Sequence, residues 1–282
     1  MTNVDHAAST VDTNSSDSSS PTVDLMGVPI SIVSRKESVD KIIVSLDEKV
    51  GGWLCTVNLD ILRQVCHVKG VRELLAYATD YVADGRPILW AASLKGVRLP
   101  ERVCGSDLIY DLTEAAAKHG KSVFFLGGNS GTADAAAVEL KRCYPQLQVA
   151  GTYCPEFGFE KNPDTMQQIR SMIIELKPDI VYVALGFPKQ EKLIKELRDA
   201  NSDPWYIGVG ISFSFVTGEV QRAPQWMQLT GIEWLHRLLQ EPGRLWKRYL
   251  VHDVPFAIEL LWKCYWSPRI QPDPTPSPAP AK

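Results

Sequence analysis

The stretch Ser122-Val-Phe-Phe-Leu126 is apolar over nearly its whole length and is followed by Gly127-Gly-Asn-Ser-Gly131 and the alanine-rich segment 132–143. An apolar run without alternation is typical of a strand buried on both faces of a parallel sheet. Similar strands are predicted at 28–33, 53–57, 81–83, 147–152, 180–185 and 205–209, with helical patterns at 38–48, 59–77, 106–119, 163–176 and 192–199. This alternation predicts an α/β fold, a Rossmann-like and mostly parallel sheet sandwiched by helices.

The chain of 282 residues is expected to form one α/β domain with appendages. Residues 1–22 are rich in Ser, Thr, Asp and Asn, and residues 267–282 carry alternating prolines, so both ends are predicted to be disordered tails. Residues 23–222 are predicted to form the core. Residues 223–266 show only helical patterns rich in Trp, Arg and Leu, which predicts a separate helical appendage.

Composition argues against several classes of protein. The formal net charge of −3 disfavours a general nucleic-acid binder. The six cysteines are scattered without a C-x-x-C pair, which disfavours zinc and disulfides and suits a reducing cytoplasm. No secretory signal is visible, and no apolar run reaches the roughly 18 residues that a transmembrane helix needs. We therefore expect a cytoplasmic protein without a metal or other cofactor.

The glycines of 127–131 allow two interpretations. A glycine-rich turn between a strand and a helix lets a phosphate approach the helix N-terminus, but it also simply makes a tight turn. The spacing is not G-x-G-x-x-G, and no acidic residue ends a following strand at the distance that a ribose requires. An enzyme that uses NAD or S-adenosylmethionine is therefore disfavoured, while both interpretations of the turn stay open.

Polar side chains end three of the predicted strands. Thr56-Val-Asn58 ends one strand, Asp84-Gly85 ends another, and the segment 186–190, with Gln190 as its last residue, follows a third. Carboxyl ends of parallel strands converge, so these groups are expected to meet. Asp84-Gly85 is consistent both with a turn and with a catalytic carboxylate. No G-x-S-x-G or H-E-x-x-H motif is present, which leaves chemistry in which a carboxylate takes a proton from a hydroxyl while amides and cations hold an anionic leaving group.

Basic and aromatic residues gather near the C-terminus. The cations at 237–248 could hold a pyrophosphate, or they could form a solvated face: Arg237, Arg244, Lys247 and Arg248. Five tryptophans lie among them, at 226, 234, 246, 262 and 266. Such helices suit a membrane interface, and equally suit packing on the body of the protein or on another copy in a homo-oligomer.

Seven longer motifs occur in one order along the chain: Thr56–Asn58, Ala83–Gly85, Leu99–Asp107, Phe125–Gly128, Leu185–Glu191, Arg222–Met227 and Glu233–Pro242. With these motifs the chain resembles the WecG/TagA/CpsF family of bacterial glycosyltransferases from about Val28 to Trp266. The resemblance implies a metal-independent, inverting enzyme that moves a sugar from a UDP-sugar to a polyprenyl-diphosphate-linked saccharide for a surface polysaccharide. It also implies a helical appendage that helps close the site and touches the cytoplasmic face of the membrane.

The resemblance also implies roles for particular residues. Asp84 corresponds to the proposed general base, and the substrate contacts correspond to Thr56, Asn58, Arg102, Gln190, Arg237, Arg244 and Lys247, with Arg248 sharing the role of Lys247. Relatives commonly carry an aspartate and a glycine where this chain has Ser214 and Ile211. This departure leaves an alternative open, a non-catalytic nucleotide-sugar-binding or scaffold protein in a polysaccharide assembly complex.

Overall fold

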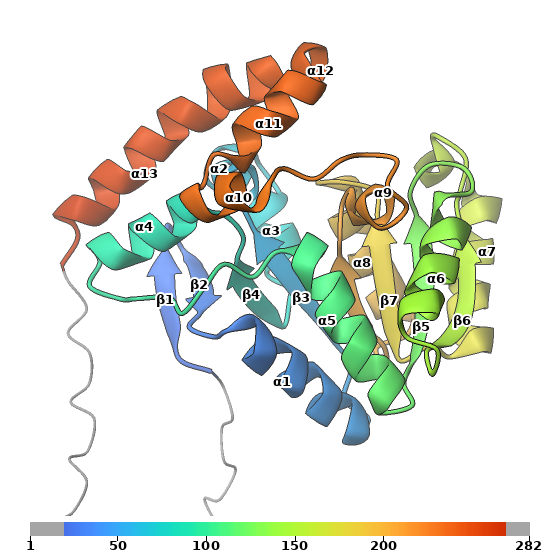
Figure 1. Cartoon of the computed structure of the whole chain (residues 1–282). Coiled ribbons are helices and arrows are strands. Elements are labelled where there is room, and N and C mark those ends of the chain that lie inside the picture. Colours follow the sequence, from blue (N-terminus) through green and yellow to red (C-terminus); the bar gives the residue numbers. More distant parts are fainter. Residues whose placement is uncertain (1–19, 269–282) are drawn as a thin grey trace, which may run out of the picture.

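A six-stranded parallel sheet lies at the centre of the computed structural model, which describes residues 20–268 (Figure 1). The strand order is β4-β3-β8-β7-β5-β6. The strands are β3 (Gly52–Val57), β4 (Asp80–Ala83), β5 (Ser122–Gly127), β6 (Gln148–Tyr153), β7 (Ile180–Ala184) and β8 (Trp205–Gly208). The prediction of an α/β fold with a parallel sheet is confirmed, and each of these strands overlaps one expected from the sequence.

Both faces of the sheet are buried, which explains the absence of polar alternation in the strands. Trp53, Cys55 and Val57 of β3 contribute to one core, whereas Leu54 contributes to the other. The first core is completed by α2 (Leu59–His67), α3 (Val71–Leu75), α4 (Arg86–Leu94), α7 (Pro163–Leu176) and α8 (Lys189–Ala200). The second is completed by α1 (Arg35–Asp47), α5 (Gly105–Lys118), α6 (Thr132–Cys143) and α9 (Ser212–Val216).

A short antiparallel hairpin precedes the sheet. It joins β1 (Thr22–Leu25) to β2 (Val28–Ser31) through Met26 and Gly27, both of which have positive φ. The sequence predicted only the second of these strands, because β1 begins at Thr22, the last residue of the polar segment 1–22 that was expected to be a disordered tail. Thr22 pairs with Ser31 in the hairpin, so the predicted tail is one residue too long. The remaining parts of the two predicted tails, 1–19 and 269–282, lie outside the described residues.

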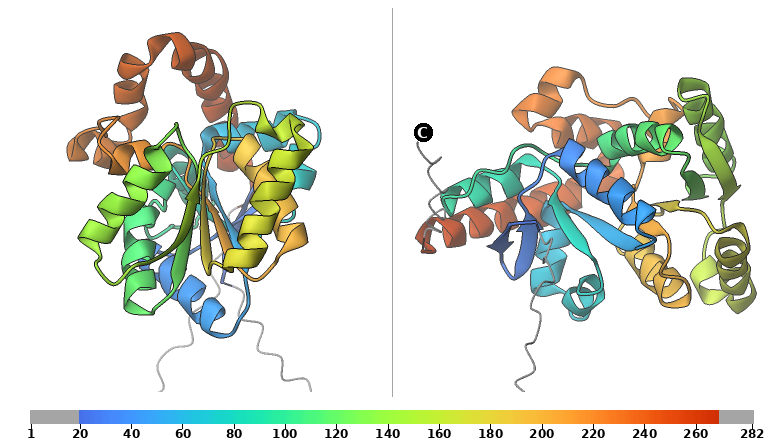
Figure 2. Two further views of the ribbon diagram at one scale, coloured as in Figure 1. Left: turned by 90° about the vertical axis from the view of Figure 1, so that its right-hand side faces the viewer. Right: turned by 90° about the horizontal axis from the view of Figure 1, so that it is seen from below.

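Five helical segments follow β8 and α9, and they lie across the end of the sheet at which the strands finish (Figures 1 and 2). They are α10 (Gln225–Thr230), α11 (Glu233–Gln240), α12 (Pro242–Trp246), the π-helix η2 (Lys247–Asp253) and α13 (Val254–Trp266). Helix α13 packs along α4, and its Phe256, Leu260 and Cys264 belong to the first core. The last helix of the predicted appendage is thus part of the body. In the described part of the chain, no helix is both long and apolar enough to span a bilayer.

The sharing of one core by α13 and the sheet predicts the effect of truncating its side chains. Leu260 is fully buried, so Leu260→Ala should lower the free energy of unfolding by about 2–4 kcal/mol through lost contacts and a residual cavity. Ile258 lies on the same helix but is 66% exposed, so Ile258→Ala should change this free energy little. Urea denaturation measures both variants, and equal effects at the two positions would contradict the observed packing.

Candidate active site

The connections that leave the sheet locate a candidate site. After β3 the chain enters α2 on one face of the sheet, and after the neighbouring β8 it enters α9 on the other face. In open α/β sheets ligands bind outside the carboxyl ends of strands at such a switch point. Asn58 directly follows β3, Asp84 directly follows the adjacent β4, and Gly210 lies two residues beyond β8. The structure therefore places Asn58 and Asp84 at neighbouring strand ends, as predicted.

Asp84 is held by the sheet itself. Its backbone N–H donates to the Val57 carbonyl of β3 at 2.9 Å, and Gly85 follows with a φ of +114°, so the expected turn is present. Burial raises the pKa of the Asp84 carboxyl to about 6; the charge of Arg102 opposes this shift and that of Glu233 adds to it. A carboxylate with this proton affinity is suited to take a proton from a hydroxyl group near neutral pH.

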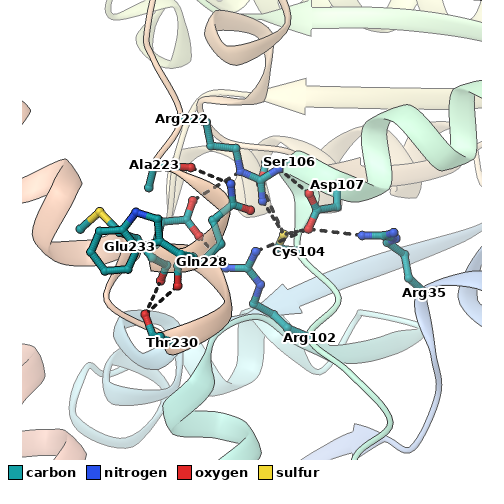
Figure 3. Close-up of polar contacts among 12 residues, drawn as sticks. Arg35, Arg102, Cys104, Ser106, Asp107, Arg222, Ala223, Gln228, Thr230 and Glu233 are labelled. Atoms are coloured by element: carbon teal, nitrogen blue, oxygen red, sulfur yellow. Dashed lines mark hydrogen bonds and ion pairs between the residues drawn. The ribbon is translucent and has the colours of Figure 1, made fainter.

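Figure 3 shows a compact network of charged side chains, and the charges of its members Arg102, Glu233 and Asp107 act on Asp84. Arg102 donates to Glu233 Oε2 at 2.6 Å and lies 3.5 Å from Asp107 Oδ2. Arg222 donates to Asp107 and approaches Glu233 Oε1 at 3.5 Å. These two arginine and two acidic side chains are only 17–21% exposed, so water is partly excluded from the ion pairs between them. Of these residues, the predicted set of site residues included only Arg102.

Two further groups complete the network at the N-terminus of α5. The Cys104 thiol donates to Asp107 Oδ2 at 3.0 Å, and Arg35 lies 3.4 Å from the same oxygen. Burial opposes ionisation of Asp107, but hydrogen bonds from Arg222 and Cys104 and the nearby guanidinium charges outweigh it and hold its pKa at about 2. Asp107 is therefore a fixed negative charge, whereas Asp84 can exchange a proton.

Thr56 and Asn58, at the end of β3, both make contacts that stabilise the fold. Thr56 is buried on β3 beside Val82 of β4. Asn58 caps α2, because its side-chain oxygen accepts the N–H of Ile61 at 3.0 Å. The amide NH₂ of Asn58 is then the part of this side chain that can donate to a ligand.

Gln190 lies beneath the loops that follow β7 and β8. It is 5% exposed, and its oxygen accepts the N–H groups of Gly186 and Gly210, each at 3.2 Å. Its nitrogen donates to Glu191 at 2.8 Å. Through these hydrogen bonds Gln190 links the loop after β7 to the loop after β8, at the carboxyl edge of the sheet. Its direct contact with substrate stays a prediction.

Glu191 is a buried acid that the sequence did not single out. It is 2% exposed, and burial raises the pKa of its carboxyl to about 7. Its position in the first turn of α8 is common for an acidic residue, so the sequence contained no signal that this one is buried.

The basic residues of the C-terminal helices differ in their burial and in their ion-pair partners. Arg237 of α11 is half-buried, and its charge acts on Asp84. Lys247 is exposed at the start of η2. Arg248 is occupied elsewhere, since its Nε lies 3.3 Å from Asp60 and 3.6 Å from Asp253. Arg244 belongs to α12, and its side chain lies outside the described part of the structure.

The departure at Ser214 has a structural counterpart. The Ser214 hydroxyl donates to one carboxylate oxygen of Glu219 at 2.9 Å, and the Thr132 hydroxyl donates to the other at 2.8 Å. A carboxylate therefore does lie within hydrogen-bonding distance of position 214, although it comes from a residue five positions later. It adjoins the glycine turn, because Thr132 begins α6.

Residues 20–268 contain no group of three or more His, Cys, Asp and Glu side chains arranged to hold a metal ion. The charged groups at the site are guanidinium and carboxylate groups paired with one another.

The chain is similar to known proteins over most of its length. The family model described as "Glycosyl transferase WecG/TagA/CpsF family" matches residues 23–270. An N-acetylglucosaminyldiphosphoundecaprenol N-acetyl-beta-D-mannosaminyltransferase of Bacillus subtilis (strain 168) is 31% identical over 205 residues, which cover 73% of this chain and 77% of the relative. The protein of the same name from Bacillus spizizenii (strain ATCC 23059 / NRRL B-14472 / W23) matches with the same identity and coverage.

The raised pKa of Asp84 predicts a pH-dependent effect on stability. Because the unfolded chain ionises this carboxyl at its lower ordinary pKa, the fold loses stability as pH rises from about 4 to about 6. Asp84→Asn should therefore raise the free energy of unfolding at pH 7.5 by about 1–2 kcal/mol, and this gain should vanish at pH 4. Denaturant titrations at the two pH values measure it. A less stable Asn variant at pH 7.5 would contradict the assigned shift.

Proposed function

The chain belongs to the WecG/TagA/CpsF family of glycosyl transferases and is a glycosyltransferase, and we propose that its donor is a UDP-sugar and its acceptor a polyprenyl-diphosphate-linked saccharide. The names of the two Bacillus relatives, which describe a diphosphoundecaprenol-linked acceptor, support the choice of acceptor. In this proposal the product is an intermediate of a bacterial surface polysaccharide.

The observation that carries the proposal is the position and proton affinity of Asp84. The acceptor hydroxyl attacks the anomeric carbon of the donor while its proton passes to the Asp84 carboxylate. The bond between that carbon and the β-phosphate oxygen breaks, and UDP leaves with the electron pair. Attack from the side opposite to the leaving group inverts the anomeric configuration. A pKa of about 6 supports this role, because the carboxyl is mostly ionised at pH 7 and still accepts a proton readily.

The departing diphosphate needs cations that the protein has not already neutralised. Arg102 is paired with Glu233 and Asp107, and Arg248 adjoins Asp60 and Asp253. Among the side chains that the structure describes, Arg237, whose charge acts on Asp84, and the exposed Lys247 are therefore the first candidates to hold the leaving group. Arg248 would have to give up its two carboxylates to join them, so in this proposal it chiefly positions η2.

The exposed aromatic face of α13 supports peripheral attachment to the cytoplasmic face of the membrane. Trp262 and Trp266 are 65% and 67% exposed, and Tyr265 between them is 60% exposed. Tryptophan and tyrosine with basic neighbours are typical of helices that lie at a lipid interface. In this orientation the lipid-linked acceptor would reach Asp84 from the side of the C-terminal helices.

Removal of the base tests the mechanism. Asp84→Asn should lower the rate of sugar transfer by about 10²- to 10⁴-fold, since positioned general-base catalysis contributes about that much. In the wild type, kcat/KM should fall as pH decreases through about 6, because protonation abolishes the base. Release of UDP from a panel of UDP-sugars with a prenyl-diphosphate acceptor measures both effects.

Asp203→Asn provides a matched control, since Asp203 is exposed in the loop before β8, at the opposite end of the sheet. This variant should transfer sugar at the wild-type rate and with the wild-type pH profile. An Asp84→Asn enzyme as fast as the control would show that Asp84 is not the base.

Attachment through α13 predicts that loss of its exposed tryptophans weakens membrane binding. The double variant Trp262→Ala/Trp266→Ala should bind anionic liposomes about tenfold more weakly, because two interfacial anchors are removed. Phe157→Ala removes an aromatic ring that is 98% exposed beyond β6, at the other edge of the sheet, and should leave binding unchanged. Cosedimentation measures all three proteins. Equal binding of the double variant and the wild type would contradict attachment through α13.

A further inference from the structure

We propose that Glu233 is a positioning residue that clamps α11 to the body of the enzyme and so keeps the charge of Arg237 within reach of Asp84. The inference deepens the proposed function and rests on it, because it concerns the same transfer site. It assigns a role to an acidic residue of the C-terminal helices, where the sequence had drawn attention only to basic and aromatic ones.

The first anchor is the double contact of the Glu233 carboxylate. One oxygen accepts from Arg102 at 2.6 Å, and the other lies 3.5 Å from Arg222 Nε (Figure 3). Arg102 belongs to the segment between α4 and α5, and Arg222 belongs to the segment between α9 and α10. Glu233 therefore ties α11 to two other parts of the chain at once. With its side chain 17% exposed, this contact is shielded from water, unlike an ordinary surface ion pair.

The second anchor is a close backbone approach just before α11. Gly231 has a φ of +84°, and a Cβ atom at this position would lie 2.6 Å from Cγ of Arg86. Arg86 begins α4 only two residues after Asp84. Glycine thus lets the turn between α10 and α11 lie directly on the segment that carries Asp84, and this contact is independent of the Glu233 ion pairs.

Helical spacing then links the clamp to the reaction. Arg237 follows Glu233 by four residues on α11, so the two side chains share one face of the helix. Both of their charges act on the Asp84 carboxyl. If α11 moved away, the charge of Arg237 would no longer act on Asp84, and the diphosphate would lose one of the two cations that this proposal assigns to it.

The charges around Asp84 give the clamp a measurable signature. Asp84 is faced by the cations of Arg102 and Arg237, by the anions of Glu233 and Asp107, and by the Cys104 thiol. The Glu233 charge raises the pKa of Asp84 more than the Arg237 charge lowers it. Loss of both, together with greater access of water, should therefore move the acid limb of the rate profile to lower pH.

The experiment compares Glu233→Gln with the wild type in the full chain. Hydrogen exchange of the α11 amides should become about tenfold faster or more, while α13, which packs separately on α4, should keep its protection. The kcat for transfer should fall by about ten- to a hundredfold, since misplacement of a catalytic contact by about 1 Å costs that much. The acid limb should move to lower pH, and Glu233→Asp, which keeps the charge, should restore part of each property.

Glu259→Gln is the matched control, because Glu259 forms ion pairs with Lys263 and His67 on α13 and α2, outside this network. It should leave α11 exchange, kcat and the pH profile unchanged. Unaltered α11 exchange in Glu233→Gln would overturn the clamp, and so would faster exchange with unaltered transfer. If the wild type transferred no sugar, the proposed function would fail, while α11 exchange would still decide whether the clamp exists.

Discussion

The burial of one carboxyl group among balanced charges is the constraint on which the rest of this site depends. Asp84 is fixed by a backbone hydrogen bond to β3, so the sheet places it, and burial raises its pKa to about 6. Without compensation an ion in this position would be too costly, or a single arginine would hold it permanently ionised. Arg102 and Arg237 oppose Glu233 and Asp107, and the result is a carboxyl that can both lose and accept a proton at physiological pH.

The architecture puts this group where two layers of the molecule meet. The parallel sheet supplies Asp84 and Asn58 from neighbouring strand ends, and the C-terminal helices supply Arg237 and Glu233. Because α13 shares a core with α4, the C-terminal helices are anchored at a point remote from α11. A lipid-linked acceptor that approaches along the aromatic face of α13 would therefore meet a site whose cations are already in place.

Much of this arrangement could be predicted from the sequence, and there are physical reasons why the rest of it could not. Apolar runs such as 122–126 predict buried strands directly. Because the carboxyl ends of parallel strands share one edge of the sheet, the sequence could also predict that Asn58 and Asp84 lie near each other. Arg102 and Glu233 are 131 residues apart, and no local pattern encodes such a contact. The Glu219 carboxylate beside Ser214 was missed although it lies only five residues away, because sequence spacing alone does not show that the chain after α9 brings it back to Ser214.

The proton affinity of Asp84 is the central claim, and it can be measured without any substrate. A ¹³C NMR titration of the aspartate carboxyl signals in the full-length protein, with the Asp84 resonance identified by its absence from Asp84→Asn, reports this pKa directly. The account predicts a midpoint near pH 6. A midpoint near pH 4, the ordinary value for an exposed aspartate, would show that burial and the surrounding charges do not prepare this carboxyl to act as a base.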